Sequence, residues 1–590
     1  MCRFNYMVDC YLIFNKMKTI NIYIIAAIAS LFIVGCSEDF LDIKPAGKVD
    51  ELSFFTDTTN IDLMVSGIYN TFLYKENCDI YDFYRWCLGD VPSDLSEAGG
   101  DSPTAWGEVY SYDELSYTAE ASVLKAVYGS MFNGISRASQ VIEQLPEARP
   151  MAGDEMNRKI DIRLAEARFL RAAYYFILAR VFGGVPVIDH ILYASEYNMP
   201  RGTIKDVYNQ METDLKAAIP YLPLESEISA NDKGRASKGA AQALLAKMYV
   251  YESSYFTYYG TNDERMGAVQ NRWQEAYDLC LEIINSGEYE LVGINGETYN
   301  TFWSQETNGF RNLFSVEGNN NRESIFAVQH IFSTGWGNYS YGCALNQFVG
   351  ARALLRKDGS LPTQGDHGWG FWVPTHKLYN LFDANDVRRK VAIGQGPDSL
   401  TGYPGDSLYG QVTIGGSKVT GWFTIANTVY QATGLENFKY EIGPHNSMII
   451  DGGFHGNTQN MYYIRYADVV LMASEAAFML NDQANALTYF NLIRERARNC
   501  GDGIHPSDLS GPVTKQEIMD ERAREFAMEG ERFFDLVRWH EAYNALNGSR
   551  MEWWDDSNND LIYIEPKNDF FPLPSFEVSK NSALEQYSGW

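Results

Sequence analysis

Basic side chains are scarce in this sequence of 590 residues. Lysine and arginine number 48 against 76 aspartate and glutamate residues, which gives a formal net charge of −28. Proteins that bind nucleic acid need a basic surface to neutralise phosphates. A polyanionic ligand would also be repelled by the chain as a whole, although a local basic pocket could still hold one. Charge therefore argues against nucleic acid as a partner.

The cysteines do not form a recognisable framework. Cys2 and Cys10 lie in or before an N-terminal signal, and Cys36 directly follows it. The remaining cysteines are odd in number and widely spaced: Cys78, Cys87, Cys280, Cys343 and Cys500. Neither a disulfide scaffold nor a zinc site follows from this spacing. A bond between Cys78 and Cys87 is conceivable, but buried free thiols are the better expectation.

Catalytic motifs are also missing. The sequence has no G-x-S-x-G elbow and no phosphate-binding G-x-x-x-x-G-K-[ST] loop, and His540-Glu541 lacks the second histidine of a zinc protease motif. Among so many acidic residues, a pair of glycosidase carboxylates cannot be recognised by spacing. We therefore expect no enzyme activity and no cofactor, with a lipid-anchored glycosidase as an alternative.

One acidic stretch resembles the beginning of a calcium loop, Asp556-x-Asn558-x-Asp560. Leu561 stands where such a loop needs glycine, and Lys567 stands where a bidentate glutamate would close it. An acidic turn without a metal is the better interpretation.

The apolar run at the N-terminus is too short to cross a membrane. It covers the 15 residues from 20 to 34 and follows Lys16 and Lys18, whereas a membrane span needs about 20 residues. The length suits a signal-peptide core. The run ends Ile33-Val34-Gly35-Cys36, which matches the lipobox that directs cleavage before a lipidated cysteine. We therefore expect residues 1–35 to be removed and residues 36–52 to form a lipidated tether.

Apolar residues recur at helical spacing along much of the chain. The predicted helices cover residues 61–74, 81–88, 123–145, 163–182, 204–222, 236–255, 273–285, 463–480 and 485–498. Residues 89–122 show no pattern, and glycine and asparagine become frequent from 288 to about 455. Short strands are predicted there at 324–329, 411–414, 419–429 and 438–442.

Residues 521–539, ERAREFAMEGERFFDLVRW, carry the most distinctive pattern of the chain. Their charges are spaced three residues apart, as in Glu521 with Arg524, Glu529 with Arg532, and Asp535 with Arg538. Large apolar residues fill the positions between them, so a solvated surface helix is the weaker interpretation. We predict two helices, or one kinked helix, divided at Gly530, with the charges paired and partly buried.

This stretch resembles the C-terminal signature of the SusD/RagB family of outer-membrane nutrient-binding lipoproteins, E-R…E-F…E-G-x-R-x-x-D-L-x-R-W. Further matches occur in the order expected for that family. They are the mature start at 36–45, the segment 166–186, Pro200-Arg201, and the tail with Leu584, Gln586, Gly589 and Trp590.

The resemblance implies a mainly α fold, a tetratricopeptide-like superhelix of about four helix pairs with an irregular excursion of loops and short strands. The predicted segments are an N-terminal helical scaffold at 53–287, the ligand-binding excursion at 288–455, and a C-terminal scaffold with the tail at 456–590. The predicted helices at 463–480 and 485–498 resemble a tetratricopeptide pair.

The resemblance also implies a function. The chain is expected to be a lipid-anchored outer-membrane protein, facing the cell exterior, that binds a glycan and delivers it to a SusC-like TonB-dependent transporter. The alternatives are an oligopeptide-binding member of the family, a glycosidase, and a protein with a purely scaffolding role.

Tryptophans suggest where a glycan would bind. Sugar rings pack on aromatic faces, while their hydroxyls need polar groups at the rim. Four tryptophans lie in helical or apolar context and are predicted to be core: Trp86, Trp273, Trp303 and Trp539. Others lie beside glycines, which can leave an indole face open, in regions where family members contact ligands. The candidate ligand-binding residues are Trp106, Trp336, Tyr339, Trp369 and Trp372.

Replacing the lipidated residue tests the anchor. We expect Cys36→Ala to leave the protein unlipidated and to move it from the membrane fraction to the soluble fraction, as followed by immunoblot after fractionation. A Cys36→Ala protein that still partitions with outer membranes would contradict the anchor assignment.

Overall fold

The computed structural model of the protein describes most of the chain after residue 57. The described residues are 58–73, 81, 84–151, 153–260, 262–299, 307–331, 342–343, 345–350, 354–356, 368–395, 407–414, 417–425, 433–440, 458–549, 552 and 560–590. Met1–Asn60 and Ile61–Trp590 form separate units, and the fold described below is that of the second. The predicted signal, Cys36 and the tether lie outside the described residues. No helix within the described ranges combines the length and apolar character that crossing a membrane requires.

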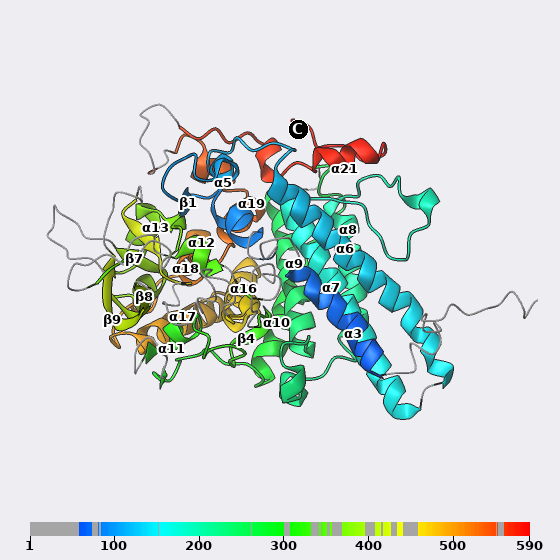
Figure 1. Ribbon diagram of the computed structural model, residues 1–590, viewed down its shortest axis with the longest axis horizontal. Helices are drawn as coiled ribbons and strands as arrows, with labels where there is room; N and C mark the ends of the chain where they lie inside the picture. The colour runs from blue at the N-terminus through cyan, green and yellow to red at the C-terminus, as the bar shows by residue number, and fades with distance from the viewer. Residues whose placement is uncertain are drawn as a thin grey trace, which may run out of the picture. The chain divides into compact units, whose positions relative to one another are not determined.

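Antiparallel helices dominate the fold (Figure 1). The long helices are α3 (Thr58–Tyr69), α6 (Ser122–Gln144), α7 (Asp154–Phe182), α8 (Ile204–Ala218), α9 (Lys238–Tyr258), α10 (Trp273–Asn285), α16 (Tyr466–Met479) and α17 (Gln483–Cys500). From α6 to α10 each helix packs on the next, and α16 packs on both α10 and α17. The prediction of a mainly α fold is confirmed.

Helix α7 shows how the sequence produces this packing. From Phe169 to Phe182 every residue is buried, because the helix is apolar on most faces and lies between α6 and α8. The helix ends at Gly183, whose φ of +70° is accessible to glycine at little cost. On α6, a Cβ at Gly134 would lie 2.4 Å from the Tyr174 ring, so glycine there permits the close approach of the two helices.

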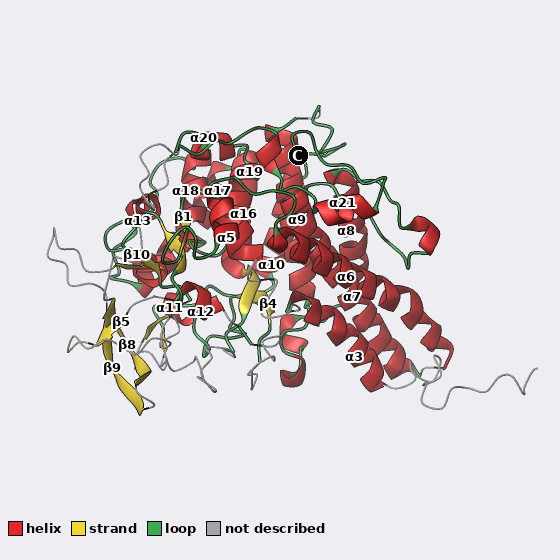
Figure 2. Cartoon of the chain, turned by 45° about the horizontal axis from the view of Figure 1, so that its top comes forward, coloured by secondary structure: helices red, strands yellow, loops and turns green. Residues whose placement is uncertain are grey.

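Short strands make small sheets beside the helices (Figure 2). All the described pairings are antiparallel. They are β1 (Ser96–Gly99) with β6 (Phe371–Pro374), β4 (Ser324–Val328) with β11 (Met461–Arg465), β7 (Ile393–Gln395) with β10 (Leu435–Asn437), β2 (Thr298–Tyr299) with β3 (Thr307–Asn308), and β9 (Ser417–Ile425) with both β5 (Leu354–Arg356) and β8 (Ser407–Ile414).

Several predicted boundaries were wrong because tertiary pairing overrode local pattern. The predicted helix at 463–480 begins as strand β11, which pairs with β4, and α16 starts only at Tyr466. The stretch 89–122, predicted to be patternless, contains β1 and the short helix α5 (Gly107–Asp113). The strand predicted at 438–442 lies earlier, at β10, where it pairs with β7.

The other described α-helices and one π-helix are short, except α18, which has 11 residues. They are the π-helix η3 (Tyr84–Asp90), α11 (Gly309–Asn312), α12 (Leu345–Val349), α13 (His376–Leu381), α14 (Val387–Ala392), α18 (Lys515–Glu525), α19 (Arg532–Arg538), α20 (Ala542–Leu546) and α21 (Ser575–Lys580).

The signature stretch forms two helices, α18 and α19, as predicted. Gly530 lies between them with φ +79°, and a Cβ there would lie 2.5 Å from the Arg85 carbonyl oxygen. Among the charged residues of this stretch that pair with one another, Arg524 is partly exposed, and the others are buried almost completely, so the surface-helix alternative is wrong. The buried ones are Glu521, Arg522, Asp535 and Arg538. Two of the predicted pairs form: Arg524 with Glu521 and Arg538 with Asp535.

The other two charges of the predicted pattern bind distant parts of the chain instead. Glu529 pairs with Arg465 and Lys439, and Arg532 pairs with Asp94. Sequence spacing cannot reveal such partners, because they come from other elements of the fold.

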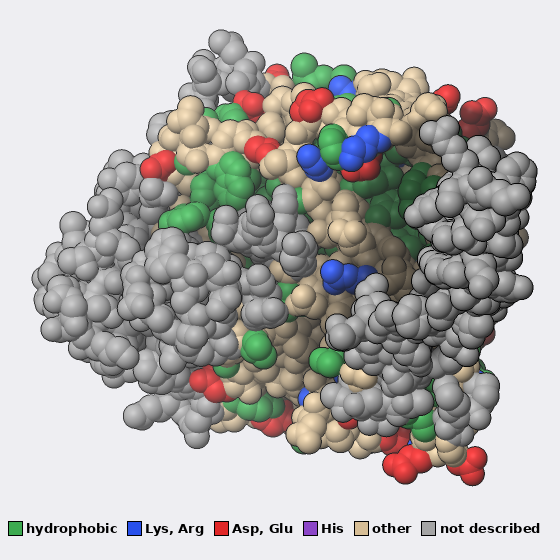
Figure 3. Space-filling model, turned by 45° about the vertical axis from the view of Figure 1, so that its right-hand side comes forward, with side chains coloured by type: hydrophobic (Ala, Val, Ile, Leu, Met, Phe, Trp, Pro, Cys, Tyr) green, Lys and Arg blue, Asp and Glu red, His purple; other side chains and the backbone are tan. Residues whose placement is uncertain are grey.

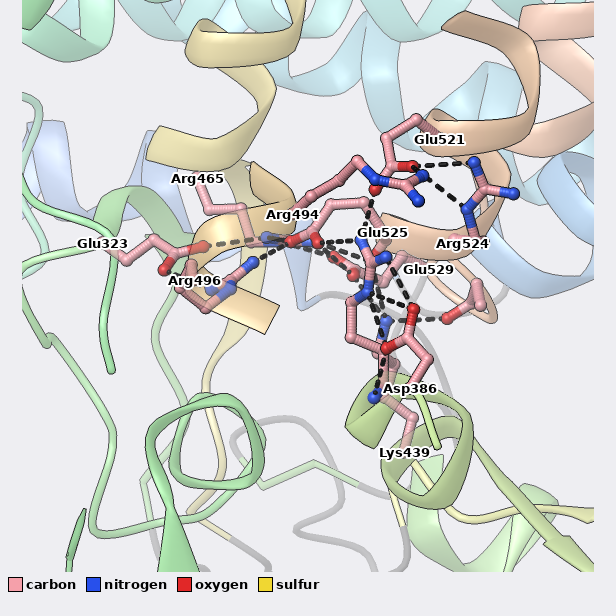
Figure 4. A network of polar contacts seen from close by, with 12 residues as sticks. Glu323, Asp386, Lys439, Arg465, Arg494, Arg496, Glu521, Arg524, Glu525 and Glu529 are labelled. Carbon is pink, nitrogen blue, oxygen red and sulfur yellow. Dashed lines mark hydrogen bonds and ion pairs between the residues drawn. The ribbon is translucent and has the colours of Figure 1, made fainter. Parts of the chain in front are cut away.

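The contacts of Glu529 belong to a buried ion network that joins three regions of the chain (Figure 4). The C-terminal turn and α18 contribute Glu521, Glu525 and Glu529. Arg465, the last residue of β11, and Arg496 of α17 both pair with Glu525 and with Glu323. Arg465 Nη1 lies 2.8 Å from Glu323 Oε1. From the predicted excursion, Arg388 pairs with Asp386, Glu521 and Glu525.

Pairing is what makes this burial possible, since an isolated buried charge is very costly. Burial by itself raises the pKa of Glu521, but the guanidinium groups of Arg524, Arg388 and Arg494 lower it to about 2. Likewise, Arg532 and Lys377 outweigh burial and lower the pKa of Asp94 to about 2. Both carboxylates are therefore ionised in the folded protein at neutral pH.

Arg538→Ala tests the buried pairs. Arg538 binds Asp535 at 2.8 Å and both carboxylate oxygens of Glu475, and its removal leaves those buried acids short of a cation. We expect a loss of about 3–5 kcal/mol in the free energy of unfolding, measured by urea denaturation. Arg498→Ala is the matched control, because its pair with Asp508 is partly exposed and contributes at most about 1 kcal/mol. A melting temperature of Arg538→Ala within about 1 °C of wild type would contradict the expectation.

The lowered carboxylate pKa values predict a specific pH dependence. In the unfolded chain Glu521 and Asp94 bind protons near their ordinary pKa values of about 4.3 and 3.9, whereas in the folded protein they stay ionised down to about pH 2. The free energy of unfolding should therefore fall as pH drops from about 4.5 to about 2.

Asp90 acts in the opposite direction. Burial raises its pKa to about 6, so its contribution to stability increases as pH falls from about 6 to about 4. Urea denaturation at a series of pH values measures the sum of these effects. A constant free energy of unfolding between about pH 4.5 and pH 2 would contradict the network's role.

Candidate functional site

Pairing of β1 with β6 brings two glycine-rich segments together. Gly99 lies opposite Phe371, and the Gly100 amide donates to the Gly370 carbonyl oxygen at 2.7 Å. A Cβ at Gly99 would lie 2.4 Å from that same oxygen, so glycine permits the close backbone approach. The result places the loop that carries Trp106 beside the segment that carries Trp369 and Trp372.

Three parallel rings form the base of this site. The ring of Trp372 stacks on that of Trp86 in η3, with centroids 6.5 Å apart and an angle of 23° between the ring planes. On its other contact it stacks on Tyr440, with centroids 5.6 Å apart and the same angle of 23°. We call Trp86, Trp372 and Tyr440 the buried stack. The prediction that Trp86 is core is confirmed. The expectation of an open face on Trp372 is wrong, because its exposure is 0%.

Three further rings lie on this base and reach the surface. Trp369 is 41% exposed, and Trp106 and Phe348 are half-buried. Phe348 lies 5.0 Å from Trp369 at 84° and 5.8 Å from Trp106. We call Trp106, Phe348 and Trp369 the aromatic shelf. Trp106 and Phe348 also contact Trp86, at 6.0 and 6.4 Å, so the shelf rests on the stack.

Sequence reasoning missed Phe348, although the signal used for the tryptophans was present there. Phe348 precedes Gly350 by two residues, and the Gly350 carbonyl oxygen accepts the Gly370 amide at 3.0 Å. The criterion of an aromatic residue near a glycine in a non-periodic segment could therefore have identified Phe348 as a candidate ligand-binding residue as well.

Polar groups accompany the shelf in the loop before α5 and on α5 itself. Ser102 Oγ donates to Asp101 Oδ1 at 3.3 Å, and Thr104 beside them is exposed. Burial and the neighbouring Glu114 raise the pKa of Tyr110 to about 12, so its hydroxyl is neutral at physiological pH. Apolar faces bordered by neutral and acidic hydrogen-bonding groups suit a hydroxylated ligand.

Two carboxylates behind the shelf do not form a catalytic pair. Glu97 of β1 and Asp113 of α5 are both buried, and Asp113 Oδ2 accepts the Ala98 amide at 2.6 Å. Burial and the charge of Glu97 hold the pKa of Asp113 well above its ordinary value. Because neither side chain reaches a surface where a glycan could bind, we assign them a structural role.

A separate groove of about 240 Å³ lies between the end of α3 and β4. Its lining combines apolar side chains, such as Phe72 and Phe326, with the basic side chains Lys233 and Arg235. A space-filling view of one face shows hydrophobic side chains in a hollow, with lysine and arginine side chains beside it (Figure 3).

The other sequence predictions have mixed outcomes. Trp273 and Trp539 are core residues, as predicted, and Cys280 and Cys500 are buried thiols. Trp336, Tyr339, Trp303, Cys78 and most of the acidic turn at 556–560 lie outside the described residues, so those expectations stay predictions. Among the residues that the structure does describe, no group of three or more His, Cys, Asp or Glu side chains is placed to hold a metal.

Comparison with known proteins defines the class. The family profile described as "SusD family" matches residues 322–590, and the one described as "Starch-binding associating with outer membrane" matches residues 39–250. SusD-like protein P2 of Formosa agariphila is 25% identical over 96% of this chain and 99% of its own length. The starch-binding protein SusD of Bacteroides thetaiotaomicron is 24% identical over 72% of each chain.

Solved structures agree. A laminarin-binding SusD-like protein has a TM-score of 0.68 and 26% identity, covering 90% of this chain and 100% of its own. The chain belongs to the SusD/RagB family of carbohydrate-binding proteins, which are not enzymes and are associated with the outer membrane. The tetratricopeptide-like helical fold of the family confirms the predicted fold class.

Proposed function

We propose that this protein is a cell-surface lipoprotein that binds a glycan on the aromatic shelf and delivers it to a TonB-dependent outer-membrane transporter. The observation that carries the proposal is the shelf itself, three partly exposed rings held on a buried aromatic base next to polar loop residues.

The shelf suits a sugar chain physically. Pyranose rings present flat C–H faces, which gain dispersion and hydrophobic energy on aromatic planes, while their hydroxyls need nearby hydrogen-bonding groups. The rings of Phe348 and Trp369 are nearly perpendicular, so the shelf offers faces in two orientations. Trp336 and Tyr339 are proposed as additional ligand contacts. Trp372 supports the shelf from below, since it is buried.

Membrane location and delivery rest on sequence and family. The lipobox at Cys36 supports a lipid anchor, and family membership supports association with the outer membrane. Exposure to the cell exterior and pairing with a SusC-like transporter are proposed from the family's role in nutrient uptake. A laminarin-binding relative makes laminarin a reasonable first ligand to test.

A second candidate is an oligopeptide-binding role. The groove between α3 and β4 combines apolar and basic lining, which would suit a peptide with apolar and acidic side chains. The glycan proposal is preferred because the groove lacks the exposed indole faces found on the shelf.

Calorimetric titration of residues 37–590 with oligosaccharides, laminarin fragments among them, and with mixed peptides tests the function. We expect a glycan to bind, and Trp106→Ala, Phe348→Ala and Trp369→Ala each to weaken it by about tenfold or more. Covering an aromatic face contributes about 1.5–3 kcal/mol. The matched control is Tyr193→Ala, because Tyr193 is an exposed aromatic in the loop after α7 and outside the shelf.

Three outcomes would count against this proposal. Peptide binding without glycan binding would support the groove instead. Glycan binding that is indifferent to all three shelf substitutions would mean that the ligand site lies elsewhere. Hydrolysis of a bound glycan by the purified protein would contradict a purely binding role.

A further inference from the structure

One residue of the signature stretch contacts the two residues that directly precede Trp86 and Tyr440 in the sequence. Glu529 Oε1 accepts from Lys439 Nζ at 2.7 Å, and the Glu529 carbonyl oxygen accepts from Arg85 Nε at 2.9 Å. Lys439 directly precedes Tyr440, and Arg85 directly precedes Trp86. These are the two rings that stack on Trp372. A single glutamate in the turn between α18 and α19 thus binds the chain on both sides of the stack.

A further hydrogen bond closes this arrangement into a circuit. Arg85 Nη2 donates to the Tyr440 hydroxyl at 3.2 Å, so the side chain of Arg85 joins Glu529 to Tyr440 directly. The circuit therefore runs by hydrogen bond from Glu529 to Lys439 and along the chain to Tyr440. It returns to Glu529 by the hydrogen bonds of Arg85 to Tyr440 and to Glu529. All four residues are buried.

The circuit is held rigidly at Glu529. Lys439 Nζ also donates to the Ala527 carbonyl oxygen at 2.7 Å, and Arg465 binds both carboxylate oxygens of Glu529 at 2.8 and 3.0 Å. The turn itself is locked against η3, because Asp90 Oδ2 accepts the Gly530 amide at 2.9 Å.

We propose that Glu529 is a positioning residue for the aromatic shelf, with its carboxylate acting through Lys439 and its backbone carbonyl through Arg85. The inference rests on the proposed glycan-binding function of that shelf. Glu529 is buried and does not contact the ligand. It holds Trp86 and Tyr440 in place, and Trp106 and Phe348 pack against Trp86. Release of the circuit lets these rings sample other positions, and binding then has to restore the arrangement at a cost in affinity.

The test compares variants inside and outside the circuit. Lys439→Met removes one arm but keeps an apolar chain of similar length against Phe314, whose ring centroid lies 4.5 Å from Lys439 Nζ. Glu529→Gln removes the charge that Lys439 and Arg465 share. The matched control is Glu521→Gln, an equally buried glutamate of the ion network that binds Arg388, Arg494 and Arg524 and no neighbour of the stack.

Two readouts separate positioning from general stability, both taken well below the melting temperature of every variant. They are the dissociation constant for the glycan found with the wild type and the near-ultraviolet circular dichroism of the stacked rings. We expect Lys439→Met and Glu529→Gln to weaken glycan binding by about tenfold and to change the spectrum. Glu521→Gln should lower the melting temperature while keeping both readouts close to wild type.

Different results would contradict the positioning role of Glu529 and the glycan-binding role of the shelf. If Trp106→Ala and Trp369→Ala lose affinity while Lys439→Met and Glu529→Gln bind like wild type, the positioning role is overturned and the shelf stands. If Glu521→Gln weakens binding as much as Glu529→Gln, the effect is general destabilisation and the positioning role is again overturned. If the tryptophan variants bind like wild type, the shelf itself is not the ligand site.

If Lys439→Met and Glu529→Gln fail to fold, a smaller change tests the positioning role. Tyr440→Phe keeps the ring on Trp372 and removes only the hydroxyl that accepts from Arg85. We expect weaker glycan binding, by about two- to fivefold, and an altered near-ultraviolet spectrum. Wild-type affinity together with a wild-type spectrum would overturn the proposal.

Discussion

The structure depends on a set of charges that are buried and can be tolerated there only in pairs. Glu525 illustrates the constraint, since it has no access to water and its oxygens bind guanidinium groups of Arg388, Arg465 and Arg496. Each of those arginines comes from a different element: α14, β11 and α17. None of these ions can stay buried unless its partners arrive, so the requirement for pairing fixes the helical scaffold and the irregular excursion against each other.

The constraint also explains why the excursion needs little regular structure. Its described strands are short and its sheets have two or three strands, which is a weak arrangement by itself. Arg388 and Lys439 nevertheless attach the excursion to α18 and to the following turn, in contacts that are fully buried. Irregular backbone can therefore carry aromatic side chains in a defined arrangement.

The rings proposed to bind the glycan and the groups that hold the fold together lie at different depths in this protein. The rings of Trp86, Trp372 and Tyr440 are enclosed, while those of Trp106, Phe348 and Trp369 reach solvent on top of them. Charged residues lie below the stack and polar loop residues lie beside the shelf. Such layering places the groups that need water or a ligand at the surface, and it leaves the costly buried charges where partners from several elements can surround them.

The sequence by itself determined those features that depend on local periodicity and on signals read along the chain. The helix at Trp273–Asn285 has the bounds expected from its apolar spacing. The sequence also predicted the division of the signature stretch at Gly530. Trp86 and Trp539 were predicted to be core residues and are buried. Among the candidate ligand residues, Trp106 and Trp369 are partly accessible in the structure.

Only the tertiary structure decided which residues meet. Residues 463–465 were predicted to be helical but belong to strand β11, because its pairing partner β4 lies more than a hundred residues away in the chain. Trp372 looked exposed because nothing in its neighbourhood along the chain indicates that Trp86 and Tyr440 enclose it. Glu529 was expected to pair with Arg532, yet it binds Lys439 and Arg465. Periodicity reports which side of an element is apolar, whereas burial and ion pairing are set by contacts between elements distant in sequence, and these form only when the chain is folded.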